Sequence, residues 1–138
     1  MILDHHQVGE ILWAALKKKL LDGWINFLLP DNEYWAAPMA DYEAIIEEST
    51  LDRMKFIGEK ADCDDFALLL KAAFIRAAWK DGKRRRPYCF GEVWGQLPMS
   101  HAINWLIDDT ETLYFVEPQS DEIFLPRADD TGIKLVKG

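Results

Sequence analysis

The spacing of apolar residues changes once along this chain, near Pro87, and this change constrains the fold most. Upstream of Pro87, apolar residues recur at the three- and four-residue spacing of an amphipathic helix. They are Phe66, Leu69, Leu70, Ala73, Phe74 and Ala77. Downstream lie four segments with the texture of strands, YCFGEVWG, HAINWLI, TLYFVEP and EIFLP. Helices followed by strands predict an α+β domain, with N-terminal helices and a central helix packed on an antiparallel sheet.

The N-terminal half contains two further helical patterns, at residues 8–21 and 41–49. Between them, WINFLLPDNEYWAAP mixes aromatic residues with two prolines, which favours extended chain and loops. The chain has 138 residues, of which 49% are apolar, and no repeat or linker interrupts them. We therefore expect a single domain spanning residues 1–138.

Charge limits the partners of this domain, because a net charge of -8 disfavours nucleic acid and anionic membrane surfaces. The N-terminus lacks a basic leader with a small-residue cleavage site, and no apolar run is long enough to span a bilayer. Two cysteines allow at most one disulfide, which fits a reducing compartment. These features predict a cytoplasmic or otherwise intracellular protein. The basic run at residues 80–86, KDGKRRR, is expected to be a solvated turn, with an anion or partner site as the alternative.

Cys63 occupies the predicted start of the central helix, inside the acidic sequence DCDD. Asp62 stands at the N-cap position and Asp65 follows three residues later, a pattern typical of a capping box. Cys63 is then the first helical residue, where free backbone amides and the helix dipole favour the nucleophilic thiolate. The alternative interpretation is a small, inert cysteine buried in the helix. Cys89 lies in a strand pattern and is expected to be structural.

His101 begins the strand pattern HAINWLI, and a hairpin joins this strand to TLYFVEP. A turn at residues 108–110 would place His101 opposite Glu117, so that the carboxylate orients the imidazole. The same register places apolar pairs on that face of the sheet, namely Ile103 with Phe115 and Trp105 with Leu113. Taken singly, His101 is better explained by a structural hydrogen bond and Glu117 by a solvated strand end.

A resemblance follows from these residues. The order of Cys63, His101 and Glu117 resembles the papain-like and transglutaminase-like cysteine peptidase superfamily. The motifs CDDF, HAINW and EPQ are more closely similar to the calcium-dependent protease domain at the C-terminus of the fairy-ring mushroom agglutinin. This similarity covers roughly half of the chain and implies a papain-like fold. It also implies that Cys63 is the nucleophile, His101 the general base and Glu117 the orienting acid of a catalytic triad.

The resemblance further implies a calcium site near Asp64, Asp65 and Gln119. Two carboxylates beside a thiolate oppose its ionisation, and a bound cation would reverse this effect. Calcium prefers the oxygen ligands that aspartate and glutamine side chains offer. The alternative is that the aspartates only stabilise the helix start, and two separated cysteines with one nearby histidine make zinc less suitable.

The predicted function is that of a cysteine peptidase, a hydrolase that cleaves a peptide or protein substrate through a thioester on Cys63, with calcium as a candidate activator. One alternative is an amidase or acyltransferase that uses the same residues on a cell-wall or other amide. The other alternative is a noncatalytic binding or assembly module, in which the acidic cluster is structural or binds calcium. The sequence does not define the oligomeric state.

Overall fold

The computed structural model describes residues 1–58, 62–98 and 100–138. In chain order the elements are β1 (Ile2–Asp4), α1 (His5–Leu16), β2 (Asn26–Leu28), β3 (Glu33–Trp35), α2 (Met39–Glu48), a 3₁₀ turn (Leu51–Arg53), α3 (Cys63–Lys80), β4 (Phe90–Leu97), β5 (Ser100–Ile107), β6 (Leu113–Glu117), β7 (Glu122–Phe124) and β8 (Thr131–Lys137). Within the described part of the chain, no helix is both long and apolar enough to cross a membrane.

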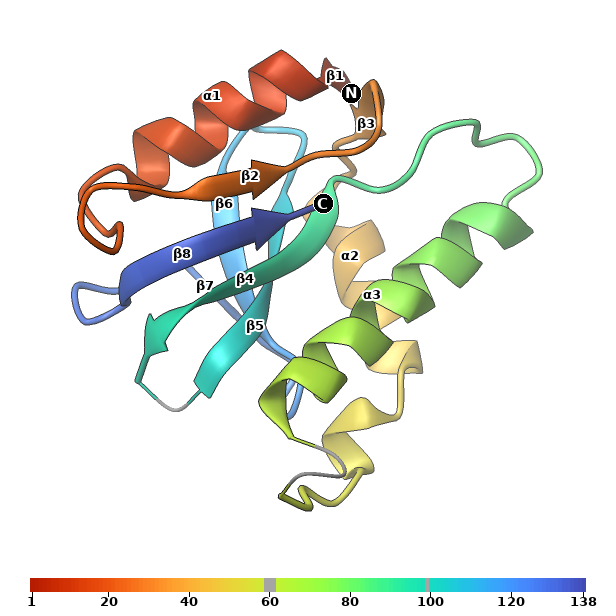
Figure 1. The fold of residues 1–138 in the computed structure, drawn as a ribbon. Helices are drawn as coiled ribbons and strands as arrows, with labels where there is room; N and C mark the ends of the chain where they lie inside the picture. Colours follow the sequence, from red (N-terminus) through yellow and green to blue (C-terminus); the bar gives the residue numbers. More distant parts are fainter. Residues whose placement is uncertain (59–61, 99) are drawn as a thin grey trace.

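A six-stranded sheet in the order β2-β8-β4-β5-β6-β7 forms the centre of the domain, with α1 on one side and α3 on the other (Figure 1). β2 runs parallel to β8, whereas the other neighbouring strands of this sheet are antiparallel. A second sheet pairs β1 with β3. The predicted arrangement of N-terminal helices on an antiparallel sheet is therefore wrong: three strands lie in the N-terminal half, and the main sheet is mixed.

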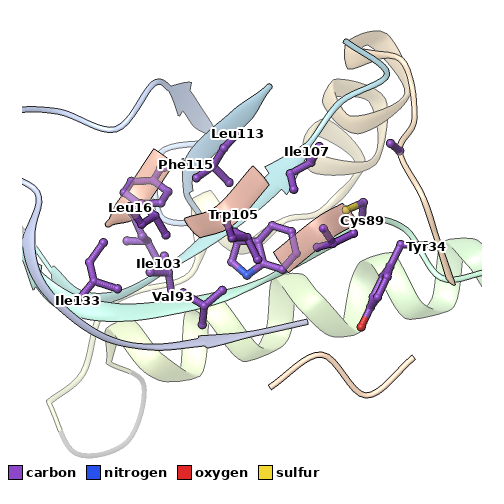
Figure 2. Packing of buried hydrophobic residues seen from close by; sticks show 14 of the residues in the cluster. Leu16, Tyr34, Cys89, Val93, Ile103, Trp105, Ile107, Leu113, Phe115 and Ile133 are labelled. Atoms are coloured by element: carbon purple, nitrogen blue, oxygen red, sulfur yellow. The ribbon is translucent and has the colours of Figure 1, made fainter. Parts of the chain in front are cut away.

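One face of the sheet packs against α1. Val8, Leu12 and Leu16 of this helix are fully buried among apolar residues of the sheet. Figure 2 shows Trp105 at the centre of this cluster, near Ile103 and Val93. The Trp105 indole Nε1 donates a hydrogen bond to the Lys137 carbonyl at 3.1 Å, so the polar atom of the ring is satisfied while its apolar surface is buried.

The other face of the sheet packs against α2 and α3. The ring of Phe74 on α3 stacks on Phe90 of β4, with centroids 3.8 Å apart. Nearer the start of α3, the buried Asn104 side chain of β5 donates hydrogen bonds to the carbonyls of Ala67 at 2.8 Å and Gly91 at 3.0 Å. Asn104 thereby links α3 to two strands and fixes the position of the helix start on the sheet.

Helix α1 begins and ends earlier than residues 8–21, the range that the spacing of apolar residues predicts. A capping box sets its start, since the Asp4 carboxylate accepts a hydrogen bond from the Gln7 amide and the Gln7 side chain accepts one from Asp4, both at 2.9 Å. Beyond Leu16, the Lys19 ammonium donates to the Arg127 carbonyl at 2.6 Å. This long-range contact holds the chain in a turn where the local pattern predicts helix.

The register of the β5–β6 hairpin is shifted by two residues from the predicted one. Trp105 pairs with Phe115, and Ile107 pairs with Leu113. The turn is longer than residues 108–110, because Asp108 Oδ1 accepts hydrogen bonds from the amides of Thr110 and Thr112 at 3.0 and 3.2 Å. The predicted pairing of His101 with Glu117 is therefore wrong, although a shift of two residues leaves each side chain on the same face of its strand.

Candidate functional site

The start of α3 has the local structure that the sequence predicts. Asp62 is the N-cap residue, and its amide donates to Asp65 Oδ2 at 3.2 Å. Cys63 is the first residue of the helix, and only 5% of its surface is exposed. It packs beside Ala67 of the same helix, Ala102 of β5 and the partly buried Trp94 of β4. The thiol thus lies between the helix and the sheet.

A cavity of about 550 Å³ opens beside Cys63, and we call it the α3 cavity. Its lining comes from the segment before α3, the first residue of α3, β4 and the turn after it, β5, and the segment after β6. The lining residues include Phe56, Cys63, Gln96, Leu97, His101 and Gln119. Three residues predicted from the sequence, Cys63, His101 and Gln119, therefore border one cavity although they are far apart in the chain.

Glu117, which the sequence predicts as the orienting acid of the site, lies near Gln119. Its Oε1 accepts a hydrogen bond from the Gln119 amide at 3.0 Å. Glu117 and Gln119 also line a neighbouring cavity of about 330 Å³, together with Arg127. Gln119 therefore lies at the boundary of both cavities, and the Glu117 carboxylate holds its backbone in place.

The acidic cluster at the start of α3 contains Asp62 in addition to Asp64 and Asp65, the two aspartates that the sequence predicts as metal ligands. Oxygen atoms of Asp62, Asp64 and Asp65 all lie within 4.8 Å of one another. Oxygens that share one calcium ion at 2.3–2.6 Å are separated by about 5 Å or less, so this spacing fits calcium. Asp62 Oδ1 is buried and has no hydrogen-bond partner among the described residues. The sequence assigns Asp62 only a capping position.

Cys89 differs from Cys63 in its surroundings. Its side chain is fully buried in the cluster on the α1 face, and burial raises the pKa of its thiol to about 12. Both cysteines are free thiols. Only Cys63 borders the α3 cavity, as its position in the sequence suggests.

Solved structures show the class of fold. A structure described as the PSL1a-E64 complex superposes with a TM-score of 0.86 at 23% identity, over 99% of this chain and 51% of that chain. Polyporus squamosus lectin, bound to the human-type influenza-binding epitope Neu5Aca2-6Galb1-4GlcNAc, superposes with a TM-score of 0.74 at 23% identity, over 94% of this chain and 46% of that chain. The chain thus has the fold of about half of each neighbour.

A family model described as Agglutinin C-terminal matches residues 34–123, and the chain belongs to this family. The match includes every residue that the sequence nominated for the site, from Cys63 to Gln119. No curated protein matches the chain.

These comparisons correct the superfamily and the activity predicted from the sequence. The matched family is that of an agglutinin, and one neighbour is a lectin, so the assignment to the papain-like and transglutaminase-like cysteine peptidase superfamily is wrong. The papain-like fold class is replaced by the sheet-rich fold of these neighbours. The predicted enzyme class, hydrolase or cysteine protease, and the peptide substrate are corrected on the same grounds. The noncatalytic binding module is the better supported of the alternatives.

Proposed function

We propose that this domain is a noncatalytic binding module and that its α3 cavity holds a small carbohydrate. The observation that carries the proposal is the lining of the cavity. Phe56 offers an aromatic face that is 52% exposed, while Gln96, Gln119 and His101 offer hydrogen-bonding side chains. An apolar face with a few convergent polar groups suits a sugar ring, which has apolar C–H faces and hydroxyl edges.

The predicted site residues acquire ligand-binding roles in this proposal. Gln119 and His101 contact ligand hydroxyls, and Cys63 forms part of the wall as a small, largely buried side chain. Glu117 acts through Gln119, because its carboxylate accepts a hydrogen bond from the Gln119 amide. The similar lectin, whose chain is about twice as long, is described with a bound trisaccharide, which supports carbohydrate as the ligand class.

Calorimetric titration with Neu5Aca2-6Galb1-4GlcNAc, the epitope bound to the similar lectin, tests the proposal. We expect saturable binding of the trisaccharide at one site. Gln119→Ala removes one hydrogen-bonding side chain and should weaken binding by roughly twofold to tenfold. The matched control is Asn26→Ala, which removes an exposed amide on β2, outside the α3 cavity, and should leave the affinity unchanged. An absence of saturable binding, or equal weakening in both variants, contradicts the proposal.

We also propose that the acidic cluster binds calcium. Asp62, Asp64 and Asp65 provide converging oxygens, and the buried Asp62 Oδ1 is available to a cation. The charge of the ion would offset the mutual repulsion of the three carboxylates. A glutamine oxygen such as that of Gln119, which lines the α3 cavity next to Cys63, is a candidate for a further ligand.

Calcium should therefore raise the stability of the folded domain. Free calcium at 100 times its Kd is expected to add about 2.7 kcal/mol to the free energy of unfolding, measured by thermal or urea denaturation. Asp64→Asn should abolish most of this increase, whereas the exposed control Asp129→Asn should retain it. A calcium effect of equal size in both variants would place the ion elsewhere, and no effect in the unsubstituted protein would refute the site.

A further inference from the structure

Another pocket, lined mostly by polar residues, lies at the opposite end of α3 from the α3 cavity. Its volume is about 230 Å³, and it lies between the loop that follows α3 and the end of β3. We call it the arginine pocket. Its lining includes Trp35, Asp81, Lys83, Arg84, Arg85 and Arg86. Four cationic side chains and one carboxylate thus gather at one place in a chain whose net charge is -8.

Backbone hydrogen bonds fix the walls of the arginine pocket. The Trp35 amide donates to the Pro87 carbonyl at 2.7 Å, and the Cys89 amide donates to the Trp35 carbonyl at 2.8 Å. These bonds hold the end of the loop against β3. Within the loop, the Arg84 amide donates to the Asp81 carbonyl at 3.0 Å. The loop therefore has a defined backbone conformation beside Trp35.

The Arg84 side chain is held in the wall of the pocket and is only 15% exposed. Its guanidinium carbon lies 4.1 Å from the ring centroid of Tyr88 and 5.2 Å from that of Trp35, both within the range of cation–π contact. Its Nε forms an ion pair with Asp81 Oδ2 at 3.4 Å. Arg86 is engaged differently, because its Nε donates to Glu33 Oε2 at 2.7 Å.

Two hydrogen-bond donors in this wall lack an acceptor among the described residues. Arg84 Nη1 and Trp35 Nε1 are buried, and neither has a hydrogen-bond partner among the residues that the structure describes. Buried N–H groups are paired in the great majority of cases, because leaving one unpaired is costly. Both donors belong to residues that line the same pocket, and the Arg84 guanidinium carbon lies 5.2 Å from the Trp35 ring centroid.

We propose that the arginine pocket binds a small oxyanion, the phosphate or carboxylate group of a small molecule. Arg84 Nη1 and Trp35 Nε1 donate hydrogen bonds to its oxygens, while Lys83 and Arg85 supply positive charge at the rim. Asp81 is already paired with Arg84, which limits its repulsion of the anion. The site is independent of carbohydrate binding in the α3 cavity, so either proposal can fail without the other.

Titration with inorganic phosphate, followed by NMR of the tryptophan indole N–H groups, tests this proposal. The chain has six tryptophans, and Trp35→Phe identifies the resonance of Trp35. We expect that resonance to shift and saturate as phosphate is added at constant ionic strength, with the other five indoles nearly unmoved. Acetate in a parallel titration distinguishes carboxylate from phosphate binding. No saturable shift of Trp35 with either anion overturns the proposal.

Charge variants separate the pocket from general electrostatic attraction. Arg84→Gln should weaken phosphate binding by about tenfold or more, because it removes a charge-assisted donor. Arg76→Gln is the matched control, since Arg76 is an exposed arginine of α3 outside the pocket and its loss changes the net charge equally. Arg84→Lys keeps the charge, loses the planar fork and should give an intermediate affinity. Equal weakening in the Arg76 and Arg84 variants would contradict a specific site.

Discussion

Replacing Trp105 with alanine is expected to lower the free energy of unfolding by about 3–5 kcal/mol, the usual cost of removing a large buried aromatic side chain. The indole is fully buried at the centre of the cluster between α1 and the sheet (Figure 2). Its removal also leaves the Lys137 carbonyl without the hydrogen bond from Nε1. Because domains of this size are stable by only about 5–15 kcal/mol, this one change removes much of the total.

Urea denaturation of Trp105→Ala measures this effect, and Trp79→Ala is the matched control. Trp79 lies on α3 with 84% of its surface exposed, so its loss should change stability by less than about 0.5 kcal/mol. Similar destabilisation of the two variants would mean that Trp105 does not anchor the core. If Trp105→Ala does not fold, Trp105→Phe should still fold with a smaller loss, because it retains most of the apolar volume.

Gly91→Ala is the second substitution with a large expected effect. A Cβ atom at Gly91 would collide with the Lys137 carbonyl oxygen and approach Trp105 Nε1 to 2.7 Å. The first of these neighbours is backbone in the adjacent strand β8, so a rotamer change cannot relieve the contact. Strand β4 must shift instead, and we expect a loss of about 3 kcal/mol in the free energy of unfolding.

The control for Gly91→Ala is Gly82→Ala, since a Cβ at Gly82 meets no heavy atom within 4 Å. Its effect should stay within about 1 kcal/mol in the same denaturation experiment. A double variant of Gly91→Ala with Trp105→Ala should lose somewhat less than the sum of the two single changes, because removing the indole relieves the 2.7 Å contact while the contact with the Lys137 carbonyl remains. Strict additivity would contradict a direct contact between these positions.

Local sequence signals predicted several elements of the fold well. The helix start at Cys63 follows from Asp62 and Asp65, and the structure places it there. The strands β4 to β7 lie within or beside the four segments whose composition favours strands. These predictions succeed because capping chemistry and apolar spacing depend on neighbours in the chain.

Elements held by distant contacts were missed. Strand β2 lies parallel to β8, and the bridge between Leu20 and Ile133 extends this parallel contact. Nothing local to residues 26–28 identifies a partner more than 100 residues away. The hairpin register failed for a different reason, because the Asp108 side chain lengthens the turn through hydrogen bonds that composition does not specify.

The sequence predicts which residues lie at the candidate site better than it predicts the function of that site. Cys63, His101 and Gln119 do border one cavity, although the register used to join His101 to Glu117 was wrong. The sequence indicates only a capping role for Asp62, and apart from the basic run it gives no signal for the unpaired donors of Trp35 and Arg84. A shared set of residue types does not define an activity, because sites with different functions occur on the same fold.

Alkylation of the two thiols with iodoacetamide at neutral pH, with calcium or with a chelator, tests the noncatalytic account most directly. Mass spectrometry locates the label, glutathione gives the rate of an ordinary thiol, and buried Cys89 is an internal reference. The account predicts that Cys63, which is 5% exposed, reacts more slowly than glutathione both with and without calcium. Selective labelling of Cys63 that is faster than glutathione and accelerated by calcium would contradict it.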